Sequence, residues 1–176
     1  SHMAVVEIPT YHKLIGITDG GMIPYPTLEQ KIDIVKNAAD LFHKLGVAKP
    51  NVAALAAVET VSEHMPETAD GQKLQEMCEK GELGEVQLEG PISFDLAISK
   101  EAASIKGYQG KITGDVDIML VPHIAAGNIM LKSQLYWNKA LMGGCVLGAQ
   151  VPIVLASRSA SAMEKELSIL LCLALG

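Results

Sequence analysis

The sequence predicts an α/β fold, a three-layer sandwich in which helices cover both faces of a mostly parallel sheet. Short apolar runs alternate with segments of helical periodicity, as in chains that join strands by crossover helices. Two of these runs, residues 52–58 and 118–121, are continuously apolar, which is typical of strands buried on both faces. Hydrophobic residues make up 49% of the 176 residues, which is enough to fill a core and argues against a disordered chain.

The first half of the chain begins with two strands and the clearest helix. Residues 5–8 and 14–18 are short apolar segments whose close spacing predicts an antiparallel pair. Thr27 and Gln30 have the spacing of a capping box and predict a helix start. Apolar residues follow at helical spacing on one face, and Gly46 ends the helix. The buried strand at residues 52–58 comes next.

The second half repeats the alternation. Short helices are expected around residues 74–78 and over 96–106, with a break of the chain at 89–91. The strand at 118–121 leads to a helix over 126–140. Two late strands are expected at 145–147 and 153–155, and the second of them is expected to be buried. Ser161 and Glu164 form a second capping box and predict a helix that runs to the C-terminus.

Composition restricts the class of protein. A net charge of −6 argues against a nucleic-acid or anionic-membrane binder. The apolar run at residues 169–175, which no other run exceeds in length, is far shorter than the ~20 residues of a spanning helix. Three scattered cysteines predict buried free thiols and a reducing cytoplasm. Residues 1–3 have the look of an expression-tag remnant, so we expect them outside the fold and His2 to be no ligand.

Three loops are candidates for a ligand site, because ligands of open α/β sheets bind beyond the carboxyl ends of strands. They are residues 18–21, residues 121–128 leading to Lys132, and residues 157–161. The third is favoured, since it precedes a helix N-terminus that attracts anions and contains three serines and Arg158, the only arginine of the chain. An arginine can hold a phosphate with a two-pronged hydrogen bond that lysine cannot reproduce.

Each candidate residue also has an interpretation that gives it no role in binding or catalysis. Arg158 could be a surface ion-pair residue, and the serines beside it could only cap the helix. Glu164 could be a base near Arg158, although its place in the capping box explains it fully. His123 is expected to be a satisfied loop residue. Asp115 and Asp117 are expected to be solvated carboxylates of a turn.

These loops also carry a family resemblance. The segment 114–122, followed by residues 126–128 and Lys132, resembles the signature of the phosphate acetyl/butyryltransferases. Further segments fit the same pattern in order along nearly the whole chain, and the pattern is closer to the butyryl branch: residues 58–61, 89–91, 94–95, 146–149 and 151–158. The resemblance implies one domain of a fold similar to the isocitrate/isopropylmalate dehydrogenases.

The resemblance implies an activity and a set of site residues. The family interconverts acyl-CoA and phosphate with acyl phosphate and CoA, here with a butyryl or other short-chain acyl group. Ser157, Arg158 and Glu164 are implied as catalytic residues, Glu164 by the spacing of a proposed base in the acetyl branch. The implied substrate-binding residues are Gly127, Asn128, Lys132, Ser159 and Ser161. No metal and no tightly bound cofactor is expected, and coenzyme A enters as a substrate.

Family members are longer than this chain, which affects domains and partners. Residues 4–158 resemble the family's second domain, and residues 159–176 are expected to form a helix that packs on a missing first domain or a partner chain. A homodimer is expected, because the charged fraction is only 19%, the expected short helix carries the apolar residues Leu74, Met77 and Cys78, and the resemblance implies pairing through the second domain. The alternative function is a non-catalytic CoA- or phosphate-binding or dimerisation module. A decarboxylating dehydrogenase would need a carboxylate cluster for a metal, which the sequence does not offer.

Overall fold

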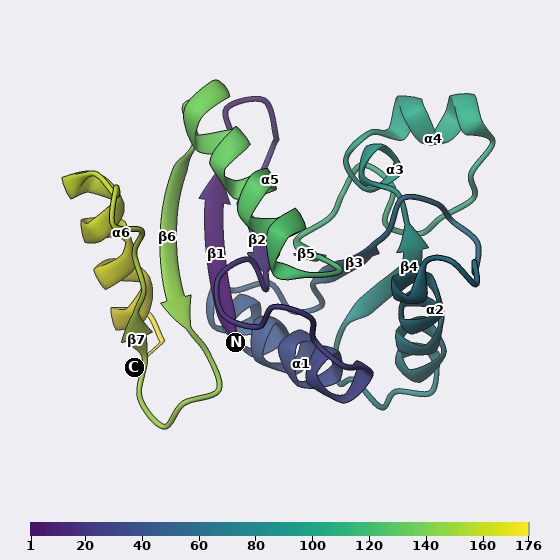
Figure 1. Cartoon of the computed structure of the whole chain (residues 1–176), viewed down its shortest axis with the longest axis horizontal. Helices are drawn as coiled ribbons and strands as arrows, with labels where there is room; N and C mark the ends of the chain where they lie inside the picture. The colour runs from purple at the N-terminus through teal and green to yellow at the C-terminus, as the bar shows by residue number, and fades with distance from the viewer. Residues whose placement is uncertain (176) are drawn as a thin grey trace.

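The computed structural model describes residues 1–175 and contains a single mixed sheet (Figure 1). Within these residues the sheet has seven strands in the order β4-β3-β5-β2-β1-β6-β7. The strands are β1 (His2–Glu7), β2 (Ile15–Thr18), β3 (Asn51–Leu55), β4 (Gln87–Ile92), β5 (Ile118–Leu120), β6 (Leu141–Val146) and β7 (Ile153–Val154). The helices are α1 (Leu28–Lys44), α2 (Pro66–Glu79), α3 (Phe94–Ile98), α4 (Lys100–Lys106), α5 (Ile124–Trp137) and α6 (Ala162–Leu173).

The pairing of the strands makes the sheet mostly parallel. Strands β2, β5, β3 and β4 are neighbours that run in the same direction. Strand β1 is antiparallel to both β2 and β6, so β6 again has the direction of the parallel set. The short strand β7 is antiparallel to β6 at the edge. The predicted antiparallel pair of the first two strands is confirmed, and so is the mostly parallel sheet.

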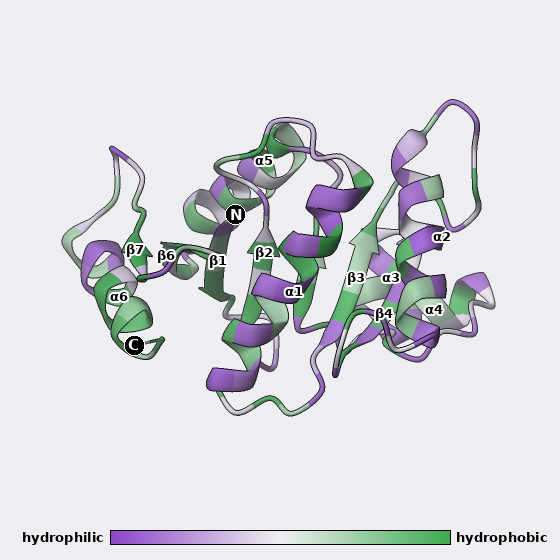
Figure 2. Cartoon of the chain, turned by 90° about the horizontal axis from the view of Figure 1, so that it is seen from below, coloured by the Kyte–Doolittle hydropathy of each residue, from purple (hydrophilic) through white to green (hydrophobic). Residues whose placement is uncertain are grey.

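Helices cover both faces of the sheet, which confirms the three layers. Successive residues of β1 point to opposite faces, as a strand requires: Met3 and Val5 belong to one apolar cluster, and Ala4 and Val6 to the other. The first cluster includes residues of α1, α2 and α6, and the second includes residues of α3, α4 and α5. Figure 2 shows α1 lying across the strands, with hydrophilic positions on its outer side.

The predicted helix starts are confirmed by their capping contacts. Thr27 Oγ1 accepts from the Gln30 backbone N–H, and the Gln30 side chain accepts from the Thr27 N–H. Ser161 and Glu164 make the same reciprocal pair at the start of α6. Both signals are local in sequence, so they do not depend on the rest of the fold.

Strand β4 corrects the prediction of a break at residues 89–91. Gly90 and Pro91 lie inside this strand. Strand β4 is an edge strand with β3 as its single neighbour in the sheet, so the missing N–H of Pro91 costs little there. Gly90 is needed because a Cβ at this position would lie 2.6 Å from the Cβ of Ala54 and 3.1 Å from the Cα of Gly71.

Two helical segments also differ from expectation. The helix predicted over residues 96–106 is divided into α3 and α4, because Ser99 has extended backbone and its side chain caps α4 by accepting from the Ala102 N–H. Helix α2 begins at Pro66, earlier than predicted. Its Leu74 is fully buried in the chain's own core, with Met77 and Cys78 packed against that core. This helix therefore gives no support to a dimer.

Both ends of the chain differ from expectation in their burial. Residues 1–3 are part of the fold: β1 begins at His2, and Met3 is fully buried. At the other end, Ile153 and Val154 of β7 are exposed, so the expectation of a buried strand before the third loop is wrong. An edge strand of two residues has a neighbour on one side only, which leaves both side chains accessible.

The C-terminal helix packs on its own sheet. Leu171 and Cys172 are buried, whereas Leu170 and Leu173 are 53% and 70% exposed. The helix backbone approaches β6 closely, since a Cβ on Gly143 would lie 3.0 Å from the carbonyl oxygen of Leu167. Ser168 Oγ accepts from the Gly144 N–H at 2.9 Å and donates to the Glu164 carbonyl at 2.7 Å. Helix α6 is thus anchored to β6 through backbone and hydroxyl groups.

Candidate active-site pocket

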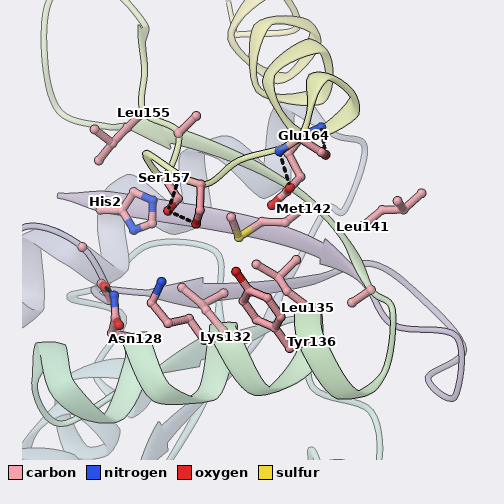
Figure 3. A pocket seen from close by; sticks show the side chains of 17 residues that line it. His2, Asn128, Lys132, Leu135, Tyr136, Leu141, Met142, Leu155, Ser157 and Glu164 are labelled. Carbon is pink, nitrogen blue, oxygen red and sulfur yellow. Dashed lines mark hydrogen bonds between the residues drawn. The ribbon is translucent and has the colours of Figure 1, made fainter.

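A pocket of about 420 Å³ lies between α5, the segment from β7 to α6, and the strands β1 and β6 (Figure 3). Helix α5 contributes Asn128, Lys132 and Tyr136, which are spaced by four residues and therefore share one face of the helix. The opposite wall contains Ser157, Ser159, Ser161 and Glu164, together with Leu155 and Ala156. His2, Leu141 and Met142 come from the strands.

All three loops selected from the sequence meet at this pocket. Gly20 and Gly21 represent the first loop, Asn128 the second and Ser157 the third. Gly127 does not line the pocket, but it allows the first and second loops to come close together. A Cβ on Gly127 would lie 2.7 Å from the Cα of Gly20, a distance that real Cβ atoms essentially never show. The two loops can approach each other because both positions are glycine.

The serine turn is closed by its own hydrogen bonds. The Ala160 N–H donates to the Ser157 carbonyl at 3.0 Å. The hydroxyls of Ser157 and Ser159 are 3.1 Å apart, and the Ser159 N–H points to Ser157 Oγ at 3.4 Å. The hydroxyls lie on the pocket wall with the N-terminus of α6 behind them, which makes this wall suitable for an anion.

Glu164 both caps helix α6 and lines the pocket. Its Oε2 accepts from the Ser161 N–H at 2.8 Å, so one carboxylate oxygen serves the capping box. The same side chain is half-buried and lines the pocket at the end opposite His2 (Figure 3). A carboxylate at this place can accept a proton from a ligand.

The two cations of the site have different positions. Lys132 lines the pocket and takes part in no ion pair within residues 1–175. Arg158 lies in the same turn as the serines, but its side chain is exposed and does not line the pocket. Its guanidinium also has no carboxylate partner in the described part of the chain, which disagrees with the alternative of a surface ion pair. Asn128 Nδ2 donates to the Gly20 carbonyl at 3.5 Å.

His2 is the pocket residue that sequence reasoning missed. It is 6% exposed and lines the pocket, so the expectation that it is no ligand is not supported by its position. The neighbouring pattern offered a signal, because residues 3–6 are apolar and continue directly from His2 as a buried strand. Burial lowers the pKa of His2 below its ordinary value, although the Asp19 carboxylate opposes this effect.

The other candidate residues have structural roles. His123 caps α5, accepting through Nδ1 from the Ala126 N–H at 3.3 Å. Lys13 Nζ lies 2.9 Å from Asp115 Oδ1 and 2.8 Å from Asp117 Oδ1. Asp117 Oδ2 also accepts from the Asn51 N–H at 2.7 Å. The expectation of solvated turn carboxylates therefore fails for Asp117, which is buried and bonded.

The cysteines and the remaining sites do not add chemistry. Cys145 and Cys172 are buried, and burial raises the pKa of the Cys145 thiol to about 12, which makes it a poor nucleophile. Within residues 1–175 no group of three or more histidine, cysteine or acidic side chains could hold a metal ion. Over the same residues, no helix has the length and apolar character needed to cross a membrane.

Comparison with known proteins places the chain in a family. A family model described as phosphate acetyl/butaryl transferase matches residues 1–172. The phosphate butyryltransferase of Clostridium acetobutylicum is 39% identical over 171 residues, which cover 97% of this chain and 57% of that protein. The phosphate acetyltransferase of Rhizobium meliloti is 44% identical over 161 residues, covering 92% of this chain and 51% of that protein.

A solved structure agrees with the sequence comparisons. The branched-chain phosphotransacylase of Enterococcus faecalis V583 superimposes with a TM-score of 0.90 at 38% identity, covering 99% of this chain and 62% of that one. The chain thus spans about half to three-fifths of the length of the relatives it matches. On the match over residues 1–172, the chain belongs to the phosphate acetyl/butyryltransferase family.

Proposed function

We propose that this protein is a phosphate acyltransferase that interconverts acyl-CoA and phosphate with acyl phosphate and CoA. The observation that supports this most directly is the pocket where three loops of the family pattern meet. The end of the pocket near His2 has the polar groups of Asn128, Lys132 and Ser157, and the other end has Leu135, Leu141 and Met142 together with the Glu164 carboxylate (Figure 3). A short acyl phosphate would lie with its phosphate at the first end and its apolar chain against the three apolar side chains, so butyryl or a similar acyl group is the proposed substrate.

The polar end would bind the phosphate. Lys132 supplies a positive charge that has no carboxylate partner among residues 1–175, and Ser159 and Ser161 supply hydroxyls in front of the α6 N-terminus. Arg158 would reach the phosphate or the leaving charge from the rim by turning its exposed side chain inward. Asn128 would add an amide donor, and Gly127 would hold its loop close to Gly20.

The reaction needs a base and an oxyanion site. Glu164 would take the proton from the CoA thiol, because the thiolate is the nucleophile. The sulfur forms a bond to the acyl carbonyl carbon, and the carbonyl oxygen becomes an oxyanion that Ser157 would stabilise. The bond from carbon to the phosphate oxygen then breaks, and phosphate leaves with the electron pair. No covalent intermediate with the protein is required.

The length of the chain favours a second candidate function. The chain spans 57% and 51% of two relatives, so a wall of the complete active site could be contributed by the part that it does not match. In that case this chain is a CoA- or phosphate-binding module that binds without turnover. Adding the unmatched domain of a relative would then restore the acyl transfer.

We also propose the partners and the compartment that the sequence predicts. The exposed apolar residues of α6 would contact either the unmatched domain or a second copy in a homodimer. Light scattering at several concentrations tests for the homodimer by measuring the mass in solution. A monomer at every concentration contradicts the homodimer. Free cysteines agree with a reducing cytoplasm.

Release of CoA from butyryl-CoA in the presence of phosphate tests the function. The unsubstituted chain should release thiol only when phosphate is added, and Ser157→Ala should lower the rate by ~10²–10³ as the loss of an oxyanion donor does. Ser104→Ala is the control, since Ser104 is an exposed serine of α4 outside the pocket. Binding of CoA without turnover supports the second candidate, and the absence of both refutes the proposal.

A further inference from the structure

The imidazole of His2 is a buried polar group without a partner. Its residue is 6% exposed, and Nδ1 is fully buried with no hydrogen bond among the described residues. The backbone of His2 is satisfied, because its N–H donates to Asp19 Oδ2 at 2.9 Å and its carbonyl accepts from Thr18 Oγ1 at 2.8 Å. Because Nδ1 is sealed off and the residue still lines the pocket, Nε2 is the ring nitrogen that a ligand could reach.

Two glycines form a slot that fixes the ring. A Cβ on Gly21 would lie 2.7 Å from His2 Nδ1, and a Cβ on Gly144 would lie 3.3 Å from Nε2. The same point beside Gly144 lies against the carbonyl oxygen of Leu155, so Nε2 is close to the segment that leads to Ser157. Figure 3 shows the ring between the serine turn and the side chains of Asn128 and Lys132.

The enclosure of Nδ1 determines which form of the ring is favoured. Burial lowers the pKa of His2, which favours the neutral ring near pH 7. A neutral imidazole has one N–H and one lone pair. A hydrogen on Nδ1 would be buried against Gly21 without an acceptor, so the favoured tautomer has its hydrogen on Nε2. The pocket then receives a neutral N–H donor.

The same geometry disfavours His2 as a base. Accepting a proton would give a cation with hydrogens on both nitrogens, and Nδ1–H would again lack an acceptor. The Asp19 carboxylate is occupied: Oδ1 accepts from the N–H groups of Gly21 and Met22 at 2.9 and 2.7 Å, and Oδ2 accepts from the His2 N–H.

We propose that His2 is a further catalytic residue whose Nε2–H donates a hydrogen bond to the carbonyl oxygen of the acyl group. It would act beside Ser157 as the second donor to the oxyanion, and it would bind the carbonyl of acyl-CoA and of acyl phosphate in the ground state. This inference rests on the proposed acyl transfer. It names an acyl carbonyl as the ligand of His2, in contrast to the phosphate assigned to Lys132 and the serines.

Replacement by glutamine and by leucine separates a donor from a base. Glutamine places an amide N–H near the position of Nε2 but has no basicity, whereas leucine has neither property. His2→Leu should lower phosphorolysis of butyryl-CoA by ~10²-fold, and His2→Gln should retain activity within about tenfold of the original protein. His64→Leu is the control, because His64 is exposed and lies outside the pocket. Equal losses for glutamine and leucine overturn the inference.

Two readouts do not require turnover. Calorimetric affinities should show that His2→Leu weakens butyryl-CoA about tenfold more than CoA, which lacks the carbonyl. Nitrogen-15 NMR of histidine should show the His2 hydrogen on Nε2 from pH 6 to 8, with its signals assigned by their loss in His2→Gln. A hydrogen on Nδ1, or equal losses of affinity for the two ligands, overturns the inference. A chain that neither binds nor turns over butyryl-CoA overturns the proposed function together with it.

Discussion

The polar side chains at the two ends of the central strands differ in whether they have partners within the protein. Where β2, β3 and β5 begin, Lys13 bridges Asp115 and Asp117, and Asp117 also holds the Asn51 N–H. Where β2 and β5 end, Lys132 has no ion-pair partner in residues 1–175, and His2 Nδ1 has no hydrogen bond there. Both ends belong to the same sheet, so packing against the core does not explain the difference.

This difference separates the polar residues that stabilise the fold from those that are available to bind a ligand. Groups that satisfy one another contribute to folding and leave nothing for a ligand. Groups that face the pocket without a partner are available to a ligand, as the exposed Lys132 ammonium and the pocket-lining His2 ring are. Asp115 and Asp117 belong to the most recognisable segment of the sequence, yet they lie at the structural end. The substitutions that follow test this division.

The largest effect is expected at the pocket end, for Glu164→Gln. Glutamine can still close the capping box, so the melting temperature should stay within about 2 °C of the original value. The rate of acyl transfer should fall by ~10²–10⁴, as the loss of a general base does. Glu166→Gln is the control on the same helix, since Glu166 is exposed and outside the pocket. An unchanged rate would show that Glu164 is only a cap.

The next largest effect is expected at the structural end, for Asp117→Ala. The substitution leaves the Asn51 N–H without its acceptor and removes one of the two carboxylates that Lys13 bridges, so the free energy of unfolding should fall by about 2 kcal/mol. Urea denaturation measures this value, and the exposed Asp33→Ala provides the comparison. The affinity of the folded fraction for CoA should not change. A loss below about 1 kcal/mol would contradict the structural role of Asp117.

A smaller effect is expected for Arg158→Lys. A lysine retains the charge but not the two-pronged hydrogen bond, so the affinity for phosphate or CoA should fall by about tenfold. Lys165→Gln, which removes an exposed charge outside the pocket, controls for general electrostatics. Titration calorimetry measures the dissociation constants of phosphate and CoA for both variants. If Arg158→Lys binds as tightly as the original protein, Arg158 does not contact the ligand.

The smallest effect concerns the response of stability to acid. Burial opposes the change, but hydrogen bonds from Lys13 and His12 outweigh it and hold the pKa of Asp115 below its ordinary value. The stability from this carboxylate is therefore complete above its ordinary pKa and is lost as the pH falls below that value. Its side chain is 47% exposed, so solvent weakens the effect. Asp115→Asn should show a slightly smaller drop in melting temperature between pH 6 and 3, and an identical drop would contradict this role.

Local sequence signals predicted the helix starts and central strands better than they predicted the edge strands of the sheet. The pairs Thr27–Gln30 and Ser161–Glu164 specify helix starts by themselves, and continuous apolar runs specify buried strands. The Gly90-Pro91 pair was misleading because its compatibility with a strand depends on β4 lying at the sheet edge. For the same reason, the exposure of Ile153 and Val154 could not be predicted from their apolar character.

The site was predictable in its loops but not in the orientation of its side chains. Carboxyl ends of parallel strands meet at one edge, so the convergence of Gly20, Asn128 and Ser157 follows from the order of elements. The outward position of Arg158 depends on the torsions of one turn, which no spacing in the sequence specifies. The sequence does not reveal His2 as a pocket residue, because residues 1–3 resemble an expression-tag remnant, whereas their place in β1 depends on pairing with β6, far away in sequence.

The contact of α6 with Gly143 and Gly144 has a practical consequence for engineering. Because backbone groups and the Ser168 hydroxyl anchor this helix, its outward side chains can be changed without loosening it from the sheet. Replacing Leu170 and Leu173 by glutamine would therefore remove the proposed apolar contact with a partner and keep the serine turn and Glu164 in place. The glycines at 143 and 144 are the positions at which a designed library should allow no variation.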